Sequence, residues 1–89
     1  MINQKVSEAG LYEQLAEEAA ELAHAALKKA RILRGENPTP MLSATADKHV
    51  IEELSDVVLC ARILNVAPDE DVMTTKQERW IKRLNGGAL

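Results

Sequence analysis

The sequence predicts an all-α fold, an antiparallel helical bundle of two long helices and a shorter C-terminal helix that is completed by oligomerisation. The chain of 89 residues has no Phe, one Trp and one Tyr, whereas alanine and leucine, which favour closely packed helices, abound. Its prolines lie only between three segments of helical character. One small domain, residues 1–89, cannot cover the apolar stripes of two long helices, so we expect a homodimer or homotetramer.

The first helix is expected from about Ser7 to Arg34. Ser7 suits the N-cap and Gly35 the C-terminal stop. The following "GENPTP", residues 35–40, breaks the helix and forms a stiff turn in which Asn37 is a turn residue. The apolar stripe of this helix is formed by Leu11, Leu15, Leu22 and Ala26.

The second helix is expected from Ser43 or Thr45 to Asn65. Within "HVIEELSDVVLCARIL", residues 49–64, apolar side chains point in almost every direction, which predicts a helix buried nearly all round. Cys60 lies among these aliphatic residues and is expected to act as a small hydrophobe.

The third helix is predicted over "TTKQERWIKRLNGG". It should open at Thr75, which forms a capping box with Glu78, and close at Gly86.

Each of the two long helices carries a pair of carboxylates spaced i, i+3 at its apolar side. Such a pair alone is usually part of a solvated face, but burying two pairs among apolar residues is costly without a cation. A turn between the helices would bring the pairs face to face, and oxygen ligands of this kind suit Mg²⁺, with Mn²⁺ as a substitute. The predicted metal ligands are Glu18, Glu21, Glu53 and Asp56.

"EEAAE" at residues 17–21 followed by "EELSD" at residues 52–56 resembles the E-E-x-x-E and E-x-x-D motifs of the MazG-like family of all-α nucleoside triphosphate pyrophosphohydrolases. The likeness extends from about residue 11 to 84. The spacer between the motifs, residues 22–52, is long for the family, and Thr74 stands where MazG-like proteins often have Asn.

The resemblance implies Mg²⁺-dependent hydrolysis of a nucleoside triphosphate to the monophosphate and pyrophosphate, as in the cleansing of nucleotide pools. Glu18 would be both a catalytic residue and a metal ligand, and Glu17 would orient or deprotonate the attacking water unless it is only an exposed helix residue. Phosphoribosyl-ATP pyrophosphohydrolase activity, or a non-catalytic helical dimer that retains the acidic motif, remains open. The base, the sugar and the number of metal ions also remain open.

The third segment is locally basic. Lys76, Arg79 and Arg83 are spaced i, i+3, i+7 and share one face, which suits phosphate binding or a solvated surface. Trp80 either stacks on a base or belongs to the core. The expected substrate-binding residues are Lys76, Arg79 and Trp80.

Composition narrows the remaining function classes. A net charge of −3 and a pI near 5.3 argue against a nucleic-acid partner. The apolar runs are too short for a membrane span, and "MINQKVSEAG" lacks the apolar core of a signal peptide, so we expect a cytoplasmic protein without a membrane partner. Glu21 and His24 form the Glu-x-x-His unit of di-iron bundles, but no second unit follows Asp56. His49 is expected on the helix surface.

Overall fold

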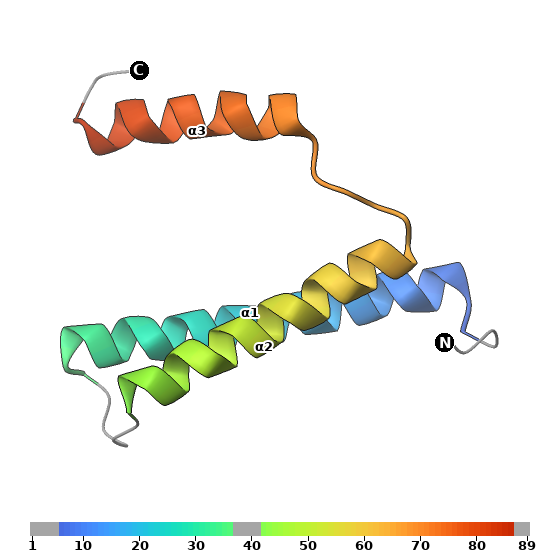
Figure 1. The fold of residues 1–89 in the computed structure, drawn as a ribbon, viewed down its shortest axis with the longest axis horizontal. Helices are drawn as coiled ribbons and strands as arrows, with labels where there is room; N and C mark the ends of the chain where they lie inside the picture. Colours follow the sequence, from blue (N-terminus) through green and yellow to red (C-terminus); the bar gives the residue numbers. More distant parts are fainter. Residues whose placement is uncertain (1–5, 37–41, 87–89) are drawn as a thin grey trace.

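The computed structural model describes residues 6–36 and 42–86 and is all-α within them (Figure 1). It contains three α-helices and no strand in these ranges: α1 (Glu8–Arg34), α2 (Ser43–Ile63) and α3 (Glu70–Leu84). The predicted fold class is therefore confirmed at the level of two long helices and a shorter third. Asn37 and most of the predicted proline turn lie outside the described residues.

Both predicted ends of α1 are confirmed. The Ser7 hydroxyl accepts a hydrogen bond from the Gly10 N–H at 3.0 Å, as an N-cap does. At the other end Gly35 adopts φ +73°, and its N–H donates to the Ile32 carbonyl at 3.1 Å. Glycine suits this left-handed position because it has no Cβ.

The end of α2 and the start of α3 depart from the sequence prediction. α2 begins at Ser43, one of the two predicted positions, and ends at Ile63, two residues before Asn65. The predicted start of α3 at Thr75 is wrong, because the helix begins at Glu70. The Asp69 carboxylate accepts a hydrogen bond from the Val72 N–H at 2.9 Å and so caps the helix more than a turn earlier.

α1 and α2 lie side by side as a helical hairpin (Figure 1). The Lys29 ammonium pairs with the Asp47 carboxylate at 2.8 Å and also donates to Ser43, which ties late α1 to early α2. The less exposed residues of both helices recur at alternating spacings of four and three, as in a coiled-coil seam. We call this line the seam; it contains Leu11, Leu15, Glu18, Leu22, Ala25, Lys29 and Ile32 of α1 and Ala46, Val50, Glu53, Val57 and Cys60 of α2.

The predicted α1 stripe is correct except at its last residue. Leu11, Leu15 and Leu22 lie in the seam, but Ala26 is exposed and Ala25 takes the seam position. The 4–3 alternation of the seam selects Ala25, since Ala25 lies three residues after Leu22 and four before Lys29.

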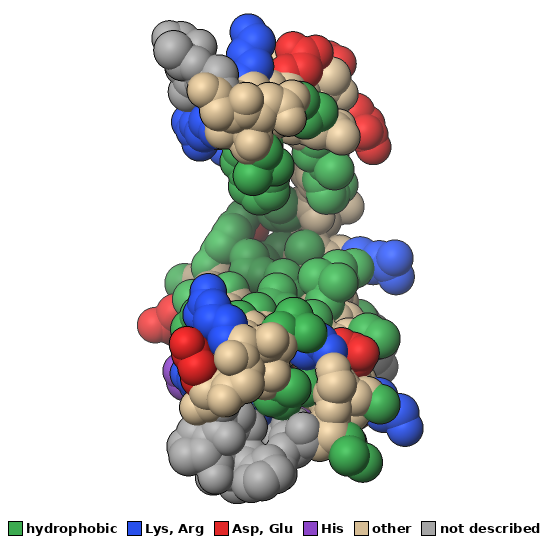
Figure 2. Space-filling view, turned by 90° about the vertical axis from the view of Figure 1, so that its left-hand side faces the viewer, with side chains coloured by type: hydrophobic (Ala, Val, Ile, Leu, Met, Phe, Trp, Pro, Cys, Tyr) green, Lys and Arg blue, Asp and Glu red, His purple; other side chains and the backbone are tan. Residues whose placement is uncertain are grey.

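The prediction that α2 is buried nearly all round is wrong for the single chain. Within the described residues only Ala46 and Cys60 are buried, while Ile51 and Leu54 are 63% and 48% exposed. The reason is that α3 makes no contact with α1 or α2, so α2 packs against one helix alone. Figure 2 shows hydrophobic side chains gathered on the side of the hairpin that faces α3 and on the side of α3 that faces the hairpin.

Two smaller findings complete the fold. Cys60 is 7% exposed inside the seam, which confirms its interpretation as a small hydrophobe. Among the residues that the structure describes, no helix combines the length and the apolar character that crossing a membrane requires.

Candidate metal site

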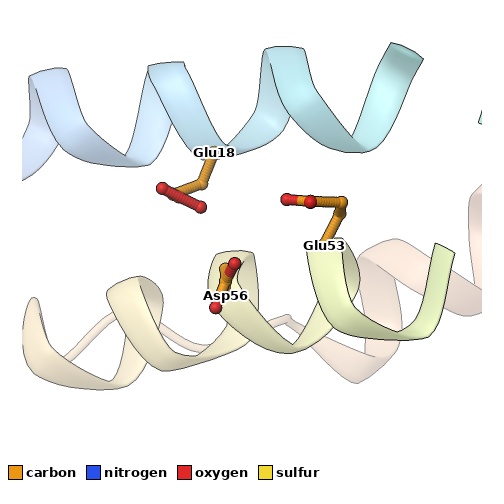
Figure 3. A group of neighbouring side chains, drawn as sticks. All are labelled: Glu18, Glu53 and Asp56. Carbon is orange, nitrogen blue, oxygen red and sulfur yellow. The ribbon is translucent and has the colours of Figure 1, made fainter. Parts of the chain in front are cut away.

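Three carboxylates from two helices converge near the middle of the hairpin (Figure 3). One oxygen each of Glu18 on α1 and of Glu53 and Asp56 on α2 lie within 4.8 Å of one another. These are three of the four residues predicted as metal ligands. The helical hairpin brings them together across about 35 residues of sequence.

The seam explains why these carboxylates are held near one another. Glu18 and Glu53 occupy seam positions and are half-buried, whereas Asp56 is exposed at the rim. The Gln14 side-chain amide donates to Glu18 Oε1 at 2.9 Å, one turn earlier on α1. Sequence reasoning missed Gln14, although its i, i+4 spacing from Glu18 is the signal that would have identified it.

Two of the carboxylate oxygens have no hydrogen-bond partner. Glu18 Oε2 and Glu53 Oε2 are both shielded from solvent and unpaired in the described part of the chain. A shielded polar atom without a partner is destabilising, and more so when it carries charge. Within residues 6–36 and 42–86 the ion pair that forms joins Lys29 to Asp47, and no ion pair reaches the three carboxylates. In these ranges no cationic side chain therefore pairs with the carboxylates of the site.

The electrostatics of the site act most strongly on Glu53. Its pKa is raised above the ordinary value of 4.5, first because it is partly removed from water. A side-chain hydrogen bond with Glu21 raises this pKa further, as do the negative charges of Glu21, Asp56 and Glu18. A cation bound here would offset that repulsion and favour the ionised form.

Glu21 and Glu17, the other two predicted site residues of α1, differ in their relation to Glu53. Glu21 is exposed and lies outside the group of three, but it is close enough to hydrogen-bond with Glu53. Glu17 is also exposed and does not belong to the group. Its catalytic role stays a prediction.

The residues predicted to bind substrate lie on α3, away from the carboxylates. Lys76 and Arg79 line a hollow of about 250 Å³ together with Thr75 and two other α3 residues. Trp80 is 65% exposed, so in the single chain it is not a core residue. Because α3 contacts neither α1 nor α2, one chain does not bring these side chains to the carboxylates.

A pocket of about 320 Å³ adjoins the carboxylates instead. We call it the seam pocket; it is lined by Glu21, His24, Ala25, Lys28, His49, Glu52 and Glu53. His49 is exposed, as the sequence predicted. The sequence analysis did not single out Lys28 or Glu52, although Glu21, His24 and Lys28 are spaced i, i+3, i+7 and so share a helix face.

Comparison with known proteins found no match for this chain among family models, curated protein sequences or solved structures. The likeness to the MazG-like pyrophosphohydrolases therefore stays a prediction that rests on the two acidic motifs and on the residues around them.

Proposed function

We propose that this chain is a Mg²⁺-dependent nucleoside triphosphate pyrophosphohydrolase of the MazG-like type. The observation that carries the proposal is the pair of solvent-shielded, unpartnered oxygens, Glu18 Oε2 and Glu53 Oε2, beside Asp56. A helical hairpin gains nothing from like charges in its seam unless something binds them. The motif order around these residues is the second support.

The donor set fits a hard divalent cation. Glu18, Glu53 and Asp56 offer carboxylate oxygens, with Glu21 next to Glu53 as the fourth candidate ligand. No His or Cys belongs to the group, and oxygen-only ligands favour Mg²⁺ or Mn²⁺ over zinc or copper. When bound, such an ion would neutralise phosphate charge and lower the pKa of a water molecule.

The reaction is direct hydrolysis between the α- and β-phosphates. The water oxygen forms a bond to the α-phosphorus, and the bond from that phosphorus to the α,β-bridging oxygen breaks, so that pyrophosphate leaves with the electron pair. The water's proton passes to a carboxylate, for which Glu18 and Glu17 are the candidates. Cys60 is buried in the seam, and the Ser55 hydroxyl bonds to the Ile51 carbonyl at 2.7 Å, so neither is a free nucleophile.

The oligomer belongs to the same proposal, and the shape of the single chain supports it. Its radius of gyration is 16.7 Å, whereas about 12 Å is expected for a compact domain of this length. Its accessible surface is 7354 Å², against roughly 5,200 Å² for a compact monomer of this mass. The excess exceeds the roughly 800 Å² that each partner buries in a standard interface.

The surface for the second copy is the exposed row of apolar residues on α2. Ile51, Leu54 and Val58 are spaced i, i+3, i+7, and we call them the α2 stripe. His49 and Glu52, which line the seam pocket, lie two residues before Ile51 and Leu54 and so about 200° away around the helix. Two chains joined through this stripe form an antiparallel bundle that leaves the pocket open.

Lys76, Arg79 and Trp80 keep their proposed role as substrate contacts within this assembly. Since α3 stands away from its own hairpin, the proposal requires that α3 reaches a carboxylate site once the second copy is in place.

The test is product analysis with purified protein. A panel of canonical and modified nucleoside triphosphates is incubated with Mg²⁺ or Mn²⁺, and monophosphate, diphosphate, pyrophosphate and orthophosphate are separated. We expect monophosphate and pyrophosphate from the wild type and at least a hundredfold loss in Glu53→Gln. Glu13→Gln is the matched control, because Glu13 is an exposed carboxylate of α1 outside the group. Glu17→Gln, run in parallel, decides whether that residue acts on the water.

Other outcomes would redirect the proposal. Diphosphate and orthophosphate as primary products would mean cleavage at the γ-phosphate. Turnover restricted to phosphoribosyl-ATP would select the histidine-biosynthesis enzyme. No turnover of any nucleotide, with equal thermal stability in the presence and absence of Mg²⁺ and nucleotide, would favour a non-catalytic helical dimer.

A further inference from the structure

The side of α1 that lines the seam pocket changes charge along its length. It begins with Glu21, next to the carboxylate site, and continues with His24, Lys28 and Arg31, which are spaced i, i+4, i+7. The distance along the helix from His24 to Arg31 is about 10 Å at 1.5 Å per residue. An acidic end is thus followed by a row of nitrogen donors on one face of the same helix. We call His24, Lys28 and Arg31 the α1 basic row.

Two neighbouring hollows follow this row. The seam pocket, about 320 Å³, contains His24 and Lys28 together with Glu53 of the carboxylate site. A second hollow of about 420 Å³ contains His24, Lys28 and Arg31. Since His24 and Lys28 line both, the two hollows adjoin along this row, and we call them together the track; its lining extends from Glu53 to Arg31.

The cations of the row are available to a ligand. Within the described ranges neither Lys28 nor Arg31 forms an ion pair, and both are exposed. By contrast Lys29, the next residue after Lys28, is engaged with Asp47 and Ser43. The helix thus uses Lys29 to hold the hairpin together and leaves Lys28 free on the pocket side.

The chemistry of the track suits phosphate and not a nucleobase. Its lining includes an ammonium, a guanidinium and imidazoles, which donate hydrogen bonds to phosphate oxygens. The carboxylates of Glu21, Glu52 and Glu53 line its other end, where a bound cation would offset their repulsion of phosphate. Its apolar lining is limited to Ala25 and Leu27, and it contains no Phe, Tyr or Trp ring on which a base would stack.

We propose that the α1 basic row binds the β- and γ-phosphates of the substrate, with the α-phosphate at the carboxylate site. This inference rests on the proposed function and adds the orientation of the substrate: its phosphate tail runs along α1 toward the C-terminal end of that helix. His24, Lys28 and Arg31 then contact the pyrophosphate that leaves, in addition to any contact that Lys76 and Arg79 make from α3. The base lies at the other end of the carboxylate site.

Binding of inorganic tripolyphosphate tests the row without any need for turnover. Titration calorimetry with Mg²⁺ present compares the wild type with Lys28→Gln and with the charge reversal Lys28→Glu. Loss of one charge-assisted contact should weaken binding about tenfold, and the reversal should weaken it further. Lys82→Gln is the matched control, because it removes the same charge from an exposed position on α3 that lies outside the track. Circular dichroism checks that each variant keeps its helices.

Steady-state kinetics separates this inference from the proposed function. If the wild type turns over and Glu53→Gln does not, the function holds, and the row is supported when Lys28→Gln and Arg31→Gln raise KM for the triphosphate about tenfold. If both variants match the wild type in KM and in tripolyphosphate binding, the inference fails while the function stands. If Lys28→Gln weakens tripolyphosphate binding but no nucleotide is hydrolysed, the phosphate site stands and the function fails. A wild type that does not bind tripolyphosphate with Mg²⁺ overturns the inference.

Discussion

Replacing Leu54 by alanine should weaken self-association of this protein about thirtyfold. Leu54 belongs to the α2 stripe and is 48% exposed in the single chain, so about half of its side chain is left for a second copy to cover. Full burial of a leucine side chain contributes about 1.5–3 kcal/mol, which makes the uncovered half worth about 1 kcal/mol. A twofold dimer contains the substitution twice, so about 2 kcal/mol is lost per dimer, or about thirtyfold in the dissociation constant.

Leu59 provides a matched control on the same helix. It is 56% exposed, slightly more than Leu54, but it lies five residues further on and so about 140° around α2 from it. Leu59→Ala removes the same atoms from a position outside the stripe. It should leave the dissociation constant within about fivefold of the wild type, since a surface substitution away from such a feature changes the free energy by about 0.5 kcal/mol or less in each of the two copies.

Sedimentation equilibrium over a hundredfold range of protein concentration measures both dissociation constants. Equal weakening in Leu54→Ala and Leu59→Ala would place the interface on another face of the hairpin. A wild type that stays monomeric at the highest concentration would refute the argument from exposed area altogether.

Three further predictions concern the site and the helix ends. In EDTA, the free energy of unfolding should fall as the pH rises above 4.5 through the raised pKa of Glu53, because over that interval the native state keeps a proton that the unfolded chain has lost. Urea unfolding from pH 4 to 8 should show this fall. If Glu53→Gln shows the same dependence of the free energy of unfolding on pH, the prediction is contradicted. Gly35→Ala should lower the free energy of unfolding by about 1 kcal/mol through backbone strain alone, since φ is +73° and a Cβ would meet no atom within 4 Å. Thermal unfolding should show a melting temperature several degrees lower, and an unchanged melting temperature would argue against the left-handed cap. Asp69→Ala removes the N-cap of α3 and should lower helix content at its first turn, because the helix loses about 1 kcal/mol of stability. Hydrogen exchange of the Val72 amide is the direct measurement, and protection equal to that of the wild type would count against the cap.

The helix ends show how far local sequence can predict this fold. Ser7 and Gly35 were identified as caps because an N-cap hydroxyl and a left-handed glycine act within a few residues of the end that they stabilise. The start of α3 was missed because two caps were available. Asp69 and Thr75 both suit an N-cap, and only the hydrogen bond from the Val72 N–H to the Asp69 carboxylate distinguishes them.

The carboxylate site, too, could be predicted only in part from the sequence, and the rest depended on tertiary structure. Sequence spacing was enough to place Glu18 beside an apolar stripe and Glu53 one turn from Asp56, because helical periodicity alone determines which side chains share a face. It could not show that Glu18 and Glu53 meet, since that depends on the register of α1 against α2. It also did not reveal that Gln14 holds one oxygen of Glu18.

Which cations stand near the site was decided by tertiary structure alone. The sequence analysis favoured Lys76 and Arg79 because they share one face of a basic helix, and it did not consider the basic residues of α1. The hairpin instead places Lys28 in a pocket with Glu53, while α3 makes no contact with either helix of the hairpin. Periodicity determines the faces of one helix, but the distance between residues on different helices depends on packing, and packing is settled only when the chain folds.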